Sequence, residues 1–154
     1  SVLVYPDAYE VRDELGIKSI RLGESWMSGS VVLSWESVRQ GSRNEEDGLN
    51  VVIHEFAHQL DQFNGVADGL PVLKDRKDYP EWAAVMRASY KILLERVEKG
   101  RRTVLDDYGA TNPAEFFAVS TETFFEKPKQ LEEKHPELYE QLKRFYGLNP
   151  LGWG

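Results

Sequence analysis

The chain has 154 residues, a length that fits one compact domain with a substantial core. Its net charge of −7 argues against a nucleic-acid partner, because phosphate binding needs a concentrated basic face. The absence of cysteine excludes disulfides, thiolate nucleophiles and cysteine-ligated metals, so a bound metal must rely on carboxylates and on three histidines. No apolar run approaches the roughly 20 residues that span a bilayer. We therefore expect a soluble cytoplasmic protein with no membrane partner.

The first third of the chain has the pattern of β structure. Residues 2–5 form a short apolar run before Pro6, and residues 17–26 contain apolar side chains that alternate with polar ones. Residues 30–35 form a second apolar run. We expect these three segments to form a small twisted sheet. Residues 30–35 fit either an edge strand beside a substrate cleft or an ordinary paired strand.

Helical periodicity follows the β region. Asn44, followed by three acidic residues, is a typical helix start, and Asn64-Gly65 is expected to end this helix. Further amphipathic helices are predicted for residues 80–100, for residues 112–127 and for residues 136–146. Strands followed by helices predict an α+β fold, with a small N-terminal sheet, an active-site helix and a helical C-terminal half.

The first predicted helix contains the motif H-E-x-x-H at residues 54–58. His54 and His58 are one turn apart on a single face, so both imidazoles can bind one zinc ion. Glu55 is placed to accept a proton from a zinc-bound water. The apolar positions 49, 52, 53, 56 and 60 lie on the opposite side of the helix. We expect the histidines to face a cleft and the apolar side to face the core.

A catalytic zinc site needs a third protein ligand and an open position for water. The metzincin pattern is excluded, because its Gly and His do not follow at the required spacing. His135 lies in a charged segment and is expected at the surface. The remaining candidates are Glu115, Glu122 and Asp61. Glu115 is the leading one, since it is the only charged residue from 108 to 121, although it also fits a purely structural capping box.

Longer stretches of the chain resemble a known family. The segments HEFAHQLDQFNG, at residues 54–65, and DYGATNPAEFFAV, at residues 107–119, are similar to the bacterial Mlc titration factor A family. That family consists of gluzincin metallopeptidases related in the catalytic domain to anthrax lethal factor. The similarity extends to both ends of the chain, for example to residues 23–26 and 145–146, and covers essentially all of it.

The resemblance implies a zincin-like fold with one zinc ion per chain. The implied zinc ligands are His54, His58 and Glu115, and the implied general base is Glu55. Tyr108 corresponds to an active-site tyrosine whose hydroxyl donates to the developing oxyanion. Asp61 is then a group that orients a ligating imidazole, or one at the end of the helix, rather than a ligand. The implied function is hydrolysis of peptide bonds by metal-activated water, with aminopeptidase activity as one mode.

The resemblance also bears on domains and partners. Family members usually have a helical part before the first strand, so residues 1–154 are expected to be a single catalytic domain of a longer protein. The expected partners are peptide or protein substrates. The alternative is a non-catalytic zinc-containing module that binds a transcriptional regulator, as the enterobacterial members bind the repressor Mlc.

Overall fold

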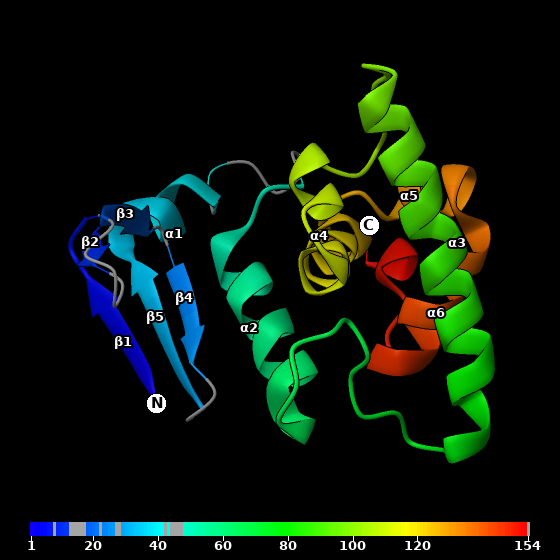
Figure 1. Ribbon diagram of the computed structural model, residues 1–154, viewed down its shortest axis with the longest axis horizontal. Coiled ribbons are helices and arrows are strands. Elements are labelled where there is room, and N and C mark those ends of the chain that lie inside the picture. The colour runs from blue at the N-terminus through cyan, green and yellow to red at the C-terminus, as the bar shows by residue number, and fades with distance from the viewer. Residues whose placement is uncertain are drawn as a thin grey trace.

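The computed structural model describes residues 1–7, 9–12, 18–21, 23–26, 29–41, 43 and 48–153. Within these ranges strands come first and helices follow, which confirms the predicted α+β class. The strands gather at one end of the molecule and the C-terminal helices at the other, with helix α2 (Val51–Asp61) between them (Figure 1). Among the described helices, none combines the length and the apolar character needed to cross a bilayer.

The three-stranded sheet has the order β1 (Val2–Tyr5), β5 (Ser30–Ser34), β4 (Gly23–Trp26). β1 runs parallel to β5, with Val2 opposite Val31, and β4 runs antiparallel to it. The three apolar residues of β5 are at most 4% exposed. A short apolar run buried in this way is typical of a central strand. The edge-strand interpretation of this segment is therefore wrong, and the edge that faces α2 is β4.

The predicted segment 17–26 does not form one strand. β2 (Tyr9–Arg12) and β3 (Lys18–Arg21) form a separate two-stranded antiparallel sheet, whereas β4 pairs with β5. Residues 17 and 22 of the predicted segment lie outside the described residues. Alternation of apolar and polar side chains indicates extended backbone but does not identify the partner strand. The change of partner between β3 and β4 therefore could not be predicted from this pattern.

Helix α2 begins at Val51, which is later than predicted. The expected start at residues 44–47 lies outside the described residues, but the three residues before Val51 are not helical. Asn50 is the N-cap: its side-chain oxygen accepts hydrogen bonds from the backbone N–H groups of Val52 and Ile53, at 3.1 and 3.2 Å. An amide cap therefore starts the helix that carries both histidines.

The other predicted helices are confirmed close to their expected ends. They are α3 (Tyr79–Glu98), α4 (Pro113–Glu126) and α6 (Pro136–Tyr146). Gly65 follows α2 and Gly100 follows α3, both with positive φ, which agrees with the predicted stops. Two short helices were not predicted, α1 (Trp35–Gly41) and α5 (Pro128–Lys134). The described chain also contains the 3-10 helices η1 (Gln62–Asn64), η2 (Arg76–Asp78), η3 (Asp107–Ala110) and η4 (Pro150–Gly152).

The hydrophobic core is built around α4. Phe116, Phe117 and Phe124 are at most 1% exposed. The ring of Phe117 lies 6.0 Å from that of Trp82, and the ring of Phe124 lies 5.1 Å from that of Tyr139, centroid to centroid. Aromatic side chains of this size account for much of the buried apolar area of a domain. The core therefore fixes α4 as a rigid support for the polar side chains near its start.

The expectation that the apolar positions of this segment face the core is wrong for Leu49, which precedes α2, and for two residues of α2 itself. Leu49, Phe56 and Leu60 are 53%, 45% and 42% exposed, whereas Glu55 and Ala57 are buried. The reason is the position of α2, which packs against β4 on one side and against α4 on another (Figure 1). The buried sides of this helix carry the polar residues of the motif, and the exposed side carries part of its apolar set.

Candidate metal centre

His54 and His58 lie one above the other on α2, as the motif spacing predicts. Their Nε2 atoms are 3.1 Å apart, and their ring centroids are 4.7 Å apart. The two side chains are 14% and 11% exposed, so both rings are largely shielded from water. Two imidazole nitrogens therefore converge on one point from consecutive turns of a helix, an arrangement that can hold a single metal ion.

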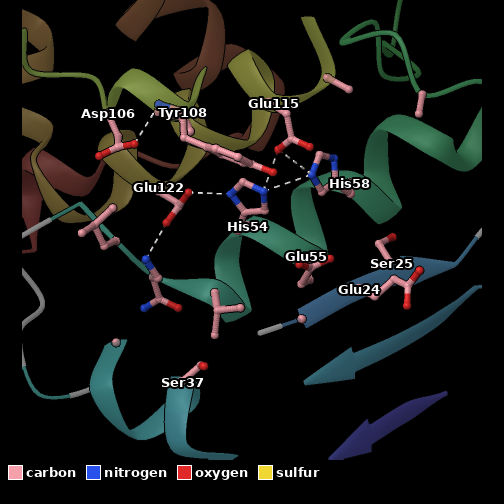
Figure 2. A pocket seen from close by; sticks show the side chains of 18 of the residues that line it. Glu24, Ser25, Ser37, His54, Glu55, His58, Asp106, Tyr108, Glu115 and Glu122 are labelled. Atoms are coloured by element: carbon pink, nitrogen blue, oxygen red, sulfur yellow. Dashed lines mark hydrogen bonds and ion pairs between the residues drawn. The ribbon is translucent and has the colours of Figure 1, made fainter. Parts of the chain in front are cut away.

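Helix α4 brings Glu115 to the same point. Its Oε2 lies 2.9 Å from His54 Nε2 and 3.2 Å from His58 Nε2 (Figure 2). Asn112, the N-cap of α4, accepts a hydrogen bond from the Glu115 backbone N–H at 2.9 Å. One half of the capping box is thus present, while the Glu115 carboxylate contacts the histidines. The cap fixes the backbone of Glu115 and the carboxylate completes the cluster.

The three side chains fit a divalent cation. One candidate ligand atom from each of His54, His58 and Glu115 lies within 4.8 Å of the other two. Two neutral imidazoles and one carboxylate are the donor set of many catalytic zinc sites. The two Nε2 atoms and the carboxylate oxygen converge on one small volume, and a positive charge placed there stabilises such an arrangement.

The other candidates for the third ligand lie elsewhere. Glu122 contacts the opposite nitrogen of His54, with its Oε1 2.7 Å from Nδ1. Asp61 is fully buried, and its Oδ2 accepts a hydrogen bond of 2.9 Å from a backbone N–H in the loop after α2. His135 stands just before α6 and is partly buried there, so it is less exposed than expected. The structure thus brings Glu115 to both histidine Nε2 atoms.

The electrostatics of the cluster favour a positive charge. Burial lowers the pKa of His54, but the carboxylates of Glu115 and Glu122 outweigh burial and raise it to about 10. Burial raises the pKa of Glu115, but hydrogen bonds from His54 and His58 outweigh it and lower that pKa to about 2. A bound metal ion would replace the proton of His54 as the source of positive charge.

We expect the metal-free protein to lose stability as the pH rises from 6.5 towards 10. The folded-state pKa of His54, about 10, lies above its ordinary value of 6.5. Its stabilising contribution is therefore complete below pH 6.5 and disappears as the pH rises through 10. Thermal unfolding of chelator-treated protein across this range measures the effect. The His54→Gln variant should have a flatter profile, and equal pH slopes in the two proteins would contradict the expectation.

Glu55 and Tyr108 lie beside the cluster (Figure 2). Glu55 is 6% exposed, and burial raises its pKa, against the opposing influence of His54 and His58. Tyr108 stands on η3 and is 55% exposed, with its ring centroid 5.9 Å from that of His54. The backbone N–H of Tyr108 donates a hydrogen bond of 2.9 Å to Asp106. Both side chains are within the region where a substrate could approach the three candidate ligands.

A cleft of about 1150 Å³ opens in front of the cluster. It is lined by the candidate ligands, by Glu55 and Tyr108, and by Gly23, Glu24 and Ser25 of β4. A Cβ atom on Gly23 would lie 2.7 Å from Cγ of Glu55, so this close approach of α2 to β4 requires glycine. Sequence reasoning assigned no site residue to β4. The only indication in the sequence was that residues 23–26 are similar to the family, and this similarity did not assign a function to any of them.

The fold and the cluster together define a class of protein. A small sheet, an H-E-x-x-H helix packed against it and a glutamate from a later helix are the features of zincin-like metalloproteins. The family model for glucose-regulated metallo-peptidases M90 matches residues 1–147, and the chain belongs to this family. This result confirms the resemblance drawn from the sequence.

The relatives of the chain are longer proteins. An uncharacterized protein of Synechocystis sp. is 44% identical over 160 residues, which cover 98% of this chain and 58% of the relative. Proteins named Mlc titration factor A from Escherichia fergusonii and Pectobacterium atrosepticum are each 35% identical over 97% of this chain and 60% of their own length. The chain therefore spans less than two thirds of the curated relatives it matches.

Proposed function

We propose that this chain hydrolyses peptide bonds with a zinc ion held by His54, His58 and Glu115. The observation that carries the proposal is the convergence of these three side chains at a cleft wall, next to the buried carboxylate of Glu55. Three protein ligands would leave a zinc ion one position for water or substrate, as in catalytic zinc sites. Membership of a metallopeptidase family supports the same reaction.

Glu55 is the proposed general base. When bound, the zinc ion supplies Lewis-acid activation of the attacking water and of the scissile carbonyl. Glu55 accepts a proton from that water and donates it to the leaving amine. Burial raises the pKa of Glu55, which makes the carboxylate a better proton acceptor than an exposed one. The same side chain can therefore serve both steps.

Metal removal and replacement test this function. We expect a chelator to abolish hydrolysis of quenched fluorogenic peptides and stoichiometric Zn²⁺ to restore it, because the activation of water depends on the ion. Each peptide should be supplied with a free and with an acetylated N-terminus. Cleavage of the free form alone supports the aminopeptidase mode, and cleavage of both supports an endopeptidase. Full activity in the metal-free protein would refute the proposal.

Tyr108 is the proposed hydrogen-bond donor to the oxyanion. We expect Tyr108→Phe to lower kcat by about 100-fold, the usual cost of losing one such donor, with little change in KM or in zinc content. Steady-state kinetics and metal analysis of the purified variant measure these quantities. The side chain is 55% exposed, so its replacement should not disturb the core. An unchanged kcat would remove Tyr108 from the mechanism.

The substrate is proposed to bind along β4. This strand is an edge of its sheet and lines the cleft beside Glu55. An extended peptide can add to such an edge through main-chain hydrogen bonds. If so, N-methylation of the peptide backbone near the scissile bond should raise KM more than kcat falls. Equal KM values for methylated and unmethylated peptides would contradict this binding mode.

The names of the relatives favour a second candidate function. Several are called Mlc titration factor A, which suggests that this chain binds a transcriptional regulator of the Mlc type. In this case the zinc site would organise a binding surface and the protein would act in the cytoplasm. Tight binding of such a regulator by wild-type protein and by Glu55→Gln, without peptide hydrolysis by either, would favour this function over the first.

A further inference from the structure

Glu122 is a buried carboxylate to which the proposed hydrolysis assigns no task. It lies on α4, two turns after Glu115 and on the same face, and is 4% exposed. Its Oε1 is 2.7 Å from His54 Nδ1 (Figure 2). Its Oε2 accepts a hydrogen bond of 2.5 Å from the backbone N–H of Asn50. The carboxylate of Glu122 on α4 therefore contacts both the His54 ring and the backbone of Asn50, near the start of α2.

The contact with His54 determines which ring nitrogen carries the proton. Both ring nitrogens of His54 lie within hydrogen-bond distance of a carboxylate, so the metal-free ring can carry a proton on each. If a metal ion replaces the proton on Nε2, Nδ1 keeps its proton and donates it to Glu122, because a carboxylate only accepts hydrogen bonds, and the lone pair of the ring is then on Nε2. Nε2 is the nitrogen that faces Glu115 at 2.9 Å and His58 at 3.1 Å. Glu122 thus directs the lone pair of His54 towards the other two candidate ligands.

The contact with Asn50 fixes the start of the helix that carries His54. Asn50 caps α2 through Oδ1, and its Nδ2 donates a hydrogen bond of 2.9 Å to Oε1 of Glu126. Two carboxylates one turn apart on α4 therefore hold the N-cap of α2, one turn before His54. The position of His54 relative to α4, and so to Glu115, depends on these contacts.

We propose that Glu122 is a positioning residue for the metal centre, which keeps His54 in the Nδ1–H form and orients its ring. Both carboxylate oxygens accept a hydrogen bond, one from His54 and one from Asn50. A glutamine at this position has one acceptor and one donor, so it must lose one of the two contacts. The inference rests on the metal site of the proposed function, but it does not require peptide hydrolysis.

The zinc-loaded wild-type protein provides the first test, which needs no variant at position 122. With ¹⁵N-labelled histidine, we expect NMR to show His54 bound to zinc through Nε2, with a slowly exchanging proton on Nδ1. The chain has only three histidines, and a His54→Gln sample assigns the signal. Zinc bound through Nδ1, or an Nδ1 proton that exchanges as fast as in an exposed imidazole, would overturn the proposal.

The second test compares Glu122→Gln with Glu126→Gln. Glu126 contacts Asn50 but lies one turn away from Glu122, so Glu126→Gln makes the same chemical change at the other carboxylate that holds the cap. We expect Glu122→Gln to weaken Zn²⁺ binding by about 10–100-fold in competition with a chromophoric chelator. Glu126→Gln should stay within about twofold of wild type, since Gln can still accept from Asn50. Equal zinc affinities in the two variants would overturn the proposal.

Glu122→Asp keeps the test decisive if Glu122→Gln does not fold. The shorter carboxylate retains two acceptors, so this variant should bind zinc more tightly than any neutral replacement at the position. Zinc binding by the wild type without peptide hydrolysis would refute the proposed function but not the positioning role, which the NMR spectrum and the zinc affinities of the variants decide. A wild-type protein that binds no zinc would refute both.

Discussion

Glu55→Gln should lower peptide hydrolysis by a factor of about 100 to 10,000 and leave the zinc bound. Loss of a positioned general base removes this much rate from a typical enzyme. Glutamine has nearly the same shape as glutamate, so the close contact with Gly23 of β4 is preserved. The measurements are kcat/KM with a fluorogenic peptide and zinc content by mass spectrometry on the same sample.

A matched control separates this effect from the loss of a negative charge. Glu133 is exposed on α5, far along the chain from the cleft residues, and Glu133→Gln makes the same chemical change there. This control should retain wild-type kcat/KM and zinc content. If Glu55→Gln retains hydrolysis at the control's level, Glu55 is not the base and the proposed mechanism is wrong.

Glu115→Ala should bind zinc more than about 100-fold more weakly than wild type. Groups that only orient a ligand contribute about 10–100-fold to metal affinity, and loss of a ligand should exceed that. The alanine leaves His54 and His58 as the two remaining donors, which is too few for a catalytic zinc site. The zinc dissociation constants of the variant and the wild type, measured by competition with a chelator, test this prediction directly.

Asp61→Asn is the control for this experiment. Asp61 was a candidate third ligand, but its Oδ2 accepts a hydrogen bond from the Gly69 N–H in the loop after α2. An asparagine oxygen can accept the same bond, so zinc affinity should stay within a few-fold of wild type. Loss of zinc in Asp61→Asn together with normal affinity in Glu115→Ala would reverse the assignment of the third ligand.

Helix ends in the C-terminal half could be predicted from the sequence. Pro113 and Pro136 open α4 and α6, and Gly147 follows α6 with a positive φ. These residues restrict their own backbone, so their effect does not depend on the rest of the fold. The start of α2 at Val51 was missed, because Asn44 with its acidic neighbours was a stronger signal than the actual cap at Asn50.

The sheet and the buried sides of α2 could not be predicted in the same way. Alternation along residues 17–26 did not reveal that β3 and β4 belong to different sheets. The apolar side chains of Phe56 and Leu60 suggested a core-facing side, yet both are exposed, because α2 packs between β4 and α4 through other residues. Partner choice depends on contacts between distant segments, which periodicity within one segment does not report.

The candidate site shows the same division between local and long-range information. The pairing of His54 with His58 follows from the chain itself, since residues four apart on a helix are neighbours wherever the helix lies. Glu115 and Glu122 lie 61 and 68 residues after His54, and the spacing of the sequence left both open as the third ligand. The packing of α4 against α2 places Glu115 at Nε2 of His54 and Glu122 at Nδ1. This assignment depends on the tertiary structure, because the way two helices pack decides which side chains from distant parts of the sequence come into contact.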